Sequence, residues 1–338
     1  MTSWSFPLSI RLTATCFMAA AVLLGATRAS AQNANAQGSL GIDQTQSQSQ
    51  LINFAAPCLQ GTDFCLLPTF DTQDDPVALA QGCTSSKQPQ TINLVAFCFD
   101  PFTGLPIPGA NMTIQVNARD GSGAHLHTDA NRPPGKFDPS SGVVGSDNLL
   151  HTVFTAPDIS GISDATVSGT LPDGTTCSPA TATIGTELPG LTAIPASGAG
   201  YTTTSSTGHD SNNSFANPSV GINLQQVPVE FNAVVQSQIS TGALPQQSTP
   251  TLTYTSLSLT YGGLFDVDAN NTGSITHPWH PPHCGHRRGI EADLRIRNVP
   301  AQLRPALIMA ITDQHFTMPV RSENQTNPTA THWHLRAR

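Results

Sequence analysis

Short runs of alternating apolar and polar residues lie between residues 88 and 185, and they predict β-strands with one buried face. Turn sequences rich in Gly, Pro, Asp and Ser separate the runs, as they do between the strands of a sandwich or barrel. The runs are residues 91–99, 112–116, 149–155, 166–169 and 180–184. We therefore expect an all-β sandwich over residues 85–185.

The pattern changes after residue 185. Residues 186–200 are rich in Gly, Pro and Ala and are expected to form a linker. An apolar row from Leu224 to Phe231 then follows helical spacing. Because proline disrupts a helix interior, we expect Pro228 to confine any helix to the residues from there on.

Two further elements complete the second half. A strand is expected over residues 252–259, where apolar positions alternate. A helix is expected over residues 302–316, beginning close to Pro305, because proline is tolerated in the first turn of a helix. Together these elements predict an α+β domain with a small antiparallel sheet over residues 201–338.

The first 31 residues have the pattern of a secretory signal. Arg11 precedes an apolar stretch that is too short to span a bilayer, and a small-x-small cleavage site follows it. Residues 32–84 are expected to be a flexible leader and a cysteine-containing segment. Beyond the signal, no segment is apolar enough to predict a membrane span. The sequence therefore predicts an exported protein, in the periplasm, at the cell surface or secreted.

The net charge and the number of cysteines add to the prediction of an exported protein. Loss of residues 1–31 removes Arg11 and Arg28 and no acid, so the net charge goes from −8 to −10. An acidic chain with two lysines lacks the basic surface that nucleic acid requires. Six cysteines remain, and an even number in an exported protein indicates disulfides without fixing their pairing.

Histidines are concentrated near the C-terminus, where seven of the eleven fall in the last 62 residues. Imidazole is the commonest side-chain ligand for metals such as zinc. His277, His280 and His283 recur among prolines, and they form either an accessory metal site or a rigid rim. His125 and His127 alternate on an expected strand, either as a second metal site or as exposed residues.

Two local patterns predict a metal centre. Residues 292–296 alternate as a strand that turns Asp293 away from the buried face, and Gly289 lets the chain bring His286 back over it. His332 and His334 share one face of a second strand, with Trp333 on the other. Two imidazoles and one carboxylate make a three-ligand zinc site with an open position for water, the arrangement of catalytic zinc.

His286, Asp293 after six residues, and a distant His-x-His together resemble the signature of a zinc peptidase superfamily. It includes lysostaphin-type endopeptidases, D-alanyl-D-alanine peptidases and the hedgehog signalling domain. The run His283-x-x-His286-x-x-Gly289-x-x-x-Asp293 looks most like the penicillin-insensitive murein endopeptidase branch. The sequences Gly262-Gly263-Leu264-Phe265-Asp266 and His334-Leu335-Arg336 fit the same branch. The resemblance covers roughly residues 196–338.

The resemblance implies the roles of individual residues. It implies that His286, Asp293 and His334 bind zinc, that His332 assists catalysis, and that His283 lies close by as a further candidate ligand. It also implies cleavage of peptide bonds in peptidoglycan cross-links. The residues 104–109, 154–157 and 160–161 separately resemble immunoglobulin-like repeats of bacterial surface proteins.

The chain departs from the family pattern at the general base. The dipeptidase branch has a glutamate three residues before the last ligand, and Thr331 stands there in this chain. The base is then His332 or a residue from elsewhere, with Glu291 and Glu323 the nearest acids in sequence. Arg287 and Arg288 either bind a substrate carboxylate or belong to a solvated loop.

The function predicted from sequence is an exported zinc-dependent peptidase that hydrolyses amide bonds of peptidoglycan or other peptides. The alternative is a non-catalytic binding or adhesion protein of the cell surface, whose zinc domain is structural or a relic. The two differ in whether the site has a usable general base.

Overall fold

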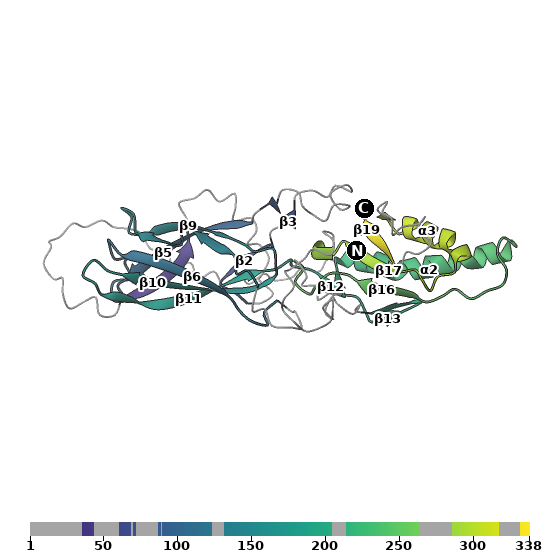
Figure 1. The fold of residues 1–338 in the computed structure, drawn as a ribbon, viewed down its shortest axis with the longest axis horizontal. Coiled ribbons are helices and arrows are strands. Elements are labelled where there is room, and N and C mark those ends of the chain that lie inside the picture. The colour runs from purple at the N-terminus through teal and green to yellow at the C-terminus, as the bar shows by residue number, and fades with distance from the viewer. Residues whose placement is uncertain are drawn as a thin grey trace, which may run out of the picture.

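The computed structural model describes residues 36–43, 61–68, 70–71, 87–88, 90–123, 132–204, 214–263, 286–317 and 332–338. The fold is mostly β and has few helices. Two hydrophobic cores organise it, which we call the β unit and the α+β unit. The two units lie end to end along the long axis of the molecule (Figure 1). The predicted signal segment and most of the predicted leader lie outside the described residues. The expectation of a flexible leader is wrong for residues 37–42, which form a strand paired with residues 94–99.

The β unit is one curled sheet of nine strands, with the order β7-β9-β5-β1-β11-β10-β6-β8 and β2 beside β11 (Figure 1). All five strand regions predicted there are confirmed as strands. Its members are β1 (Gln37–Ile42), β2 (Phe64–Leu66), β5 (Thr91–Phe99), β6 (Asn111–Ala118), β7 (Lys136–Asp138), β8 (Ser141–Val143), β9 (Leu150–Thr155), β10 (Gly161–Thr170) and β11 (Thr176–Thr186). A separate short pair, β3 (Phe70–Asp71) and β4 (Lys87–Gln88), lies outside this sheet.

Strand β1 joins the two halves of the curled sheet. It pairs with β5 in antiparallel register along its whole length. At Gln37 it also pairs with Ser178 of β11, in parallel. A disulfide between Cys98 of β5 and Cys177 of β11 ties the same two strands, and both cysteines are buried. Cys65 is disulfide-bonded as well.

A histidine connects the end of β1 to β9. The ring of His151 places Nδ1 2.7 Å from Asp43 Oδ2 and Nε2 2.7 Å from Asp147 Oδ2. The hydrogen bond with Asp147, and after it the one with Asp43, raises the pKa of His151. The hydrogen bond with His151 lowers the pKa of Asp147 in return.

The α+β unit is a six-stranded sheet packed against two helices, in the order β13-β14-β16-β17-β19-β18. Its strands are β13 (Ser197–Gly198), β14 (Tyr201–Thr203), β16 (Leu252–Ser256), β17 (Glu291–Arg295), β18 (Phe316–Thr317) and β19 (His332–Ala337). The helices are α2 (Pro218–Ser240) and α3 (Arg304–Asp313), with short turns η3 (His286–Arg288) and η4 (Ala301–Leu303). The strand predicted near residue 252 and the helix predicted to begin near Pro305 are both confirmed.

Part of the segment expected to be a linker lies within the α+β unit. Strand β12 (Thr192–Ala193) pairs with β15 (Phe215–Ala216). Ile194 is 4% exposed and belongs to the same core as the helices. The structure therefore places the residues from about 192 onward in the α+β unit, and residues 187–191 connect the two units.

Helix α2 corrects the expectation for Pro228. The helix begins at Pro218, where the side chain of Asn217 caps it by accepting from Ser219 N at 3.2 Å, and it continues through Pro228. Because proline has no N–H, the carbonyl of Leu224 loses its helical donor. The hydroxyl of Tyr254 donates to that carbonyl instead, at 2.7 Å. A tertiary hydrogen bond thus replaces the missing helical one.

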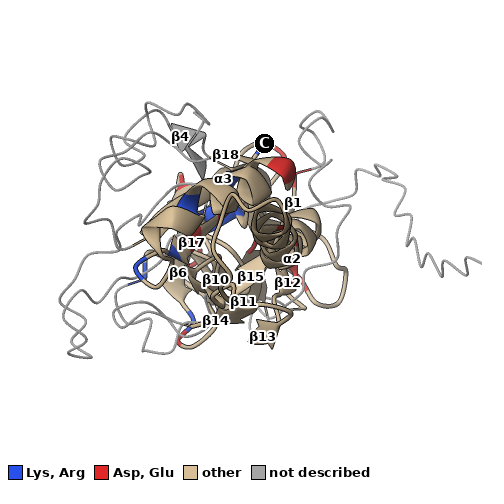
Figure 2. Ribbon diagram, turned by 90° about the vertical axis from the view of Figure 1, so that its right-hand side faces the viewer, with Lys and Arg blue, Asp and Glu red and all other residues tan. Residues whose placement is uncertain are grey.

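Charged residues are sparse in the described part of the fold, and only short stretches of ribbon are coloured in Figure 2. Charged residues make up 11% of the whole sequence. Among the described residues, no helix has both the length and the apolar character needed to cross a membrane.

Candidate metal centre

Asp293 and His334 lie directly opposite each other on neighbouring strands. β17 and β19 are antiparallel, and their register pairs Asp293 with His334. Ala292, Leu294 and Trp333 point to the other face, where each is fully buried beneath the helices. Because side chains alternate along a strand, burial of the apolar set turns Asp293 and His334 to the face away from the helices. The faces predicted from the sequence are confirmed.

His286 reaches this face from the turn that precedes β17. The turn η3 ends at Arg288 and is followed by Gly289, which adopts a φ of 68°. A Cβ at Gly289 would lie 2.5 Å from Leu191 Cδ2 and 2.9 Å from Asn217 N, so no side chain fits there. Asn217 N donates to the carbonyl of Gly289 at 2.9 Å, which holds the turn against the start of α2.

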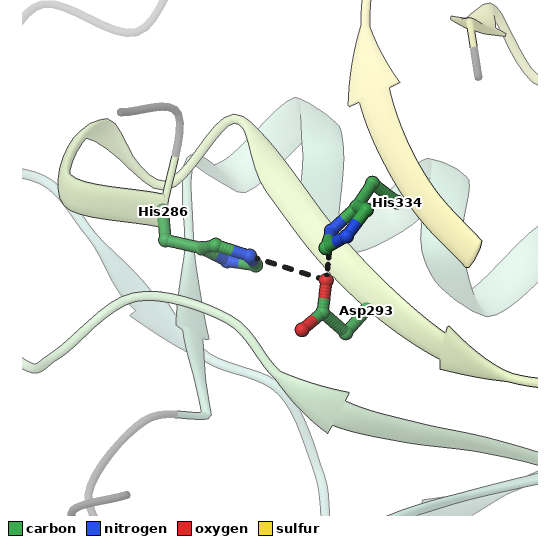
Figure 3. A group of neighbouring side chains, drawn as sticks. All are labelled: His286, Asp293 and His334. Atoms are coloured by element: carbon green, nitrogen blue, oxygen red, sulfur yellow. Dashed lines mark ion pairs between the residues drawn. The ribbon is translucent and has the colours of Figure 1, made fainter. Parts of the chain in front are cut away.

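The three side chains converge on one point (Figure 3). His334 Nδ1 lies 2.6 Å from Asp293 Oδ1, and His286 Nε2 lies 3.3 Å from the same oxygen. All three ligand atoms fall within 4.8 Å of one another. The exposed fractions are 0% for His286, 7% for Asp293 and 3% for His334, so the cluster is buried.

Burial and the two imidazoles act in opposite directions on the carboxyl of Asp293. Burial by itself raises its pKa, because a low-dielectric surrounding disfavours the charged form. The attraction of His286, together with hydrogen bonds from His286 and His334, outweighs burial and holds the pKa of Asp293 well below its usual range. Asp293 is therefore a carboxylate at neutral pH, the form in which a metal binds it.

The chemistry of this donor set fits a divalent metal. Zinc takes imidazole nitrogens and carboxylate oxygens at about 2.0–2.2 Å in a tetrahedral shell, so its ligand atoms lie about 3.3 Å apart. The His286–Asp293 separation of 3.3 Å equals that spacing, and the His334–Asp293 separation of 2.6 Å is shorter. Three protein ligands leave one position for water or substrate, as in catalytic zinc sites.

His332 stands beside this cluster. It shares a strand face with His334, and the two rings meet edge to face with their centroids 4.8 Å apart. Its partner across the strands is Arg295 of β17. His332 is partly exposed, whereas His334 is buried. This places an imidazole next to the cluster without making it a member of the three-residue set.

Two further buried polar residues lie near Asp293: Ser256, which sequence reasoning missed, and Glu291, which it named as a candidate base. Ser256 of β16 pairs with Asp293 and is 2% exposed. Glu291, two residues before Asp293 on the same face, is also 2% exposed and lies 3.9 Å from Arg336. The only signal for Ser256 in the sequence was its place as a polar residue within the alternating stretch 252–259.

The remaining predicted residues fall in different places. Arg287 is 4% exposed, and Arg288 is partly exposed, in the turn that carries His286. Five positions from the sequence argument lie outside the described residues: His277, His280, His283, Glu323 and Thr331. His125 and His127 do so as well.

Comparison with known proteins adds little to this geometry. No protein-family model matches the chain, and no curated protein matches it. Among solved structures, the adhesin InvE of Yersinia pseudotuberculosis is 17% identical over 58% of this chain, with a TM-score of 0.22. The match covers 62% of the InvE chain, so it spans less than two thirds of that protein. A similarity of this size defines neither a common fold nor a common activity.

Proposed function

We propose that the α+β unit is a single-zinc hydrolase that cleaves amide bonds of peptides in an exported protein. The observation that supports it is the convergence of His286, Asp293 and His334 in a buried cluster of two imidazoles and one carboxylate. We further propose peptidoglycan peptides as substrate and an immunoglobulin-like relationship for the β unit, both of which follow from sequence resemblance.

Each residue has a distinct task in this proposal. His286, Asp293 and His334 hold the metal, and the low pKa of Asp293 keeps it in the ligating form. A bound zinc supplies Lewis acidity, which polarises a carbonyl and makes a water nucleophilic near neutral pH. His332, 4.8 Å ring to ring from His334, moves the proton between the attacking water and the leaving amine.

Metal analysis of the purified full chain tests the site. The wild type should carry about one zinc per chain, as a mononuclear site requires. The variants His286→Ala and Asp293→Ala should each lose it. Asp313→Ala removes an exposed carboxylate at the end of α3 and should retain it. Zinc retained in both ligand variants would contradict the assignment.

Release of peptides from purified cross-linked peptidoglycan tests the reaction. His332→Ala should keep zinc and lose about 10²–10⁴-fold in rate, the usual contribution of a positioned acid or base. His334→Ala should lose both zinc and activity. A zinc-loaded wild type that cleaves neither peptidoglycan nor any D-amino-acid peptide would favour the alternative, a non-catalytic surface-binding protein.

A further inference from the structure

The turn between β9 and β10 carries the β unit into direct contact with the α+β unit. Ile159 of this turn forms an isolated bridge with Gly263, which follows β16. The next residue, Ser160, is fully buried, and its Oγ lies 2.8 Å from the carbonyl oxygens of both Tyr261 and Gly262. A hydroxyl has one proton, so Ser160 donates to one of these carbonyls at a time.

Residues 261–263 in turn contact the loop that carries His286. The backbone N–H of Gly263 donates to the carbonyl of Arg287 at 3.1 Å, and Arg287 directly follows His286. On the other side, Leu188 N, in the segment that connects the two units, donates to the carbonyl of Tyr261 at 2.8 Å. Residues 261–263 are therefore held by the β unit on one side and contact the metal-ligand loop on the other.

The packing at this point leaves no room for a side chain. A Cβ on Gly263 would lie 2.5 Å from Ser160 Oγ, and a Cβ on Gly262 would lie 2.7 Å from the carbonyl oxygen of Arg287. Both glycines also have positive φ, 67° for Gly262 and 77° for Gly263, which side chains rarely adopt. Gly263 thus allows close approach to Ser160 of the β unit, and Gly262 allows close approach to the loop that carries His286.

The turn that carries Ser160 is itself held in place. Arg132 is 3% exposed, and its guanidinium donates to the carbonyl of Ile162. A Cβ on Gly161 would lie 2.7 Å from Arg132 Cζ, so the guanidinium packs directly on the backbone of the turn. A contact made by Ser160 is therefore made from a fixed position within the β unit.

We propose that Ser160 is a positioning residue for the metal centre and that the β unit is a structural part of that centre. This role rests on the proposed function. In it, a hydroxyl from the β unit fixes the position of His286 in the α+β unit. The path runs from Ser160 to the carbonyls of Tyr261 and Gly262, through Gly263 N to Arg287, and so to His286. Metal affinity then depends on the docking of the two units, and by linkage metal stabilises the docked arrangement.

A matched pair of serine variants in the full chain tests the proposal. Ser163 is also fully buried and donates its hydroxyl to a backbone carbonyl, that of Pro134 at 2.7 Å, but this bond stays inside the β unit. Ser160→Ala and Ser163→Ala each remove one buried hydroxyl from the same strand region. Zinc affinity is measured by competition with a chromophoric chelator. We expect Ser160→Ala to weaken zinc binding by about 5- to 150-fold, the usual range of coupling between sites, and Ser163→Ala to leave it unchanged.

A second measurement needs no metal. In the metal-free protein, the amides of residues 286–290 should exchange hydrogen with solvent about tenfold faster or more in Ser160→Ala than in Ser163→Ala, because the ligand loop opens locally. Faster exchange at residues 286–290 supports the positioning role when the amides of α2 in the same variant do not exchange faster to the same degree, because a general loss of stability would affect both.

The outcomes separate this inference from the proposed function. Wild type that binds one zinc, with equal affinity in both serine variants, overturns the positioning role and leaves the metal centre intact. Wild type that binds no zinc overturns the proposed function and, with it, the metal part of the inference. Unchanged exchange at residues 286–290 in Ser160→Ala overturns the inference whatever the metal result.

Discussion

Replacing Tyr254 with phenylalanine should destabilise the α+β unit far more than the loss of one hydroxyl usually does. Tyr254 is fully buried and donates to the carbonyl of Leu224 at 2.7 Å. Burial also raises the pKa of Tyr254, so its hydroxyl remains a donor throughout the ordinary pH range. Since Pro228 cannot supply the helical N–H, Tyr254→Phe leaves a buried carbonyl without a donor. An unsatisfied buried acceptor costs about 1–3 kcal/mol.

Tyr201 provides the matched control. Its ring packs against Tyr254 with centroids 5.8 Å apart, and it is 2% exposed. Among the described residues its buried hydroxyl has no hydrogen-bond partner. Tyr201→Phe removes the same atom from the same core and leaves no acceptor unsatisfied, so it should be close to neutral or slightly stabilising.

A double-mutant cycle with Pro228→Ala identifies the mechanism. Alanine at position 228 restores the N–H that the carbonyl of Leu224 lacks, so Tyr254→Phe should cost less in that background. The coupling between the two sites should be about 0.5–3 kcal/mol. Unfolding is followed in denaturant by fluorescence, because Trp333 is buried in the same core. Equal costs for Tyr254→Phe and Tyr201→Phe, or strict additivity with Pro228→Ala, would refute the reasoning.

Three further predictions concern other parts of the fold. Replacing Cys98 and Cys177 together with alanine should lower the free energy of unfolding of the β unit by about 2–5 kcal/mol, measured by circular dichroism in denaturant. The pKa of His151 is raised in the folded state. Its contribution to the free energy of unfolding is therefore fully present below about pH 6.5, the pKa of the unfolded state, and is lost as pH rises through the folded-state pKa. The pKa of Asp147 is lowered in the folded state, so its contribution to the free energy of unfolding is present above about pH 3.9, the unfolded value, and is lost as pH falls through the folded-state pKa. His151→Gln should therefore speed hydrogen exchange in β1 more at pH 5.5 than at pH 8, and an equal effect at both would contradict this. Gly289→Ala should abolish zinc binding in the metal analysis, because its Cβ would lie 2.9 Å from Asn217 N.

The strands that surround the cluster were predictable because their signal is local. Small or apolar residues alternate with charged residues after Gly289, and this pattern predicted the strand face on which Asp293 lies. Trp333 stands between His332 and His334, and this pattern predicted that both histidines lie on the opposite face from Trp333. Neither pattern specifies which strand lies beside which. The register that sets Asp293 opposite His334, and Ser256 opposite Asp293, depends on contacts between residues 37 or more positions apart, and no short-range pattern encodes it.

The prediction that helix α2 begins at Pro228 was wrong for a related reason. The expectation for Pro228 came from a sound local rule, since proline removes a helical hydrogen bond. The rule was overridden by Tyr254, which lies on a different element and compensates the lost bond. Likewise, composition suggested a linker up to residue 200, but Ile194 packs in the second core and residues 192–193 and 197–198 pair as strands.

The position of β1 has a consequence for the order in which the β unit can fold. Residues 37–42 leave the ribosome before both of their partners, β5 and β11, and the last of these ends at residue 186. Until β11 has been made, β1 cannot join the two halves of the sheet, and its backbone edge stays available to other chains. Long sequence separation between paired strands also slows folding. The β unit should therefore close late and cooperatively, after its whole length has emerged, and a chaperone that covers exposed strand edges would act during that interval.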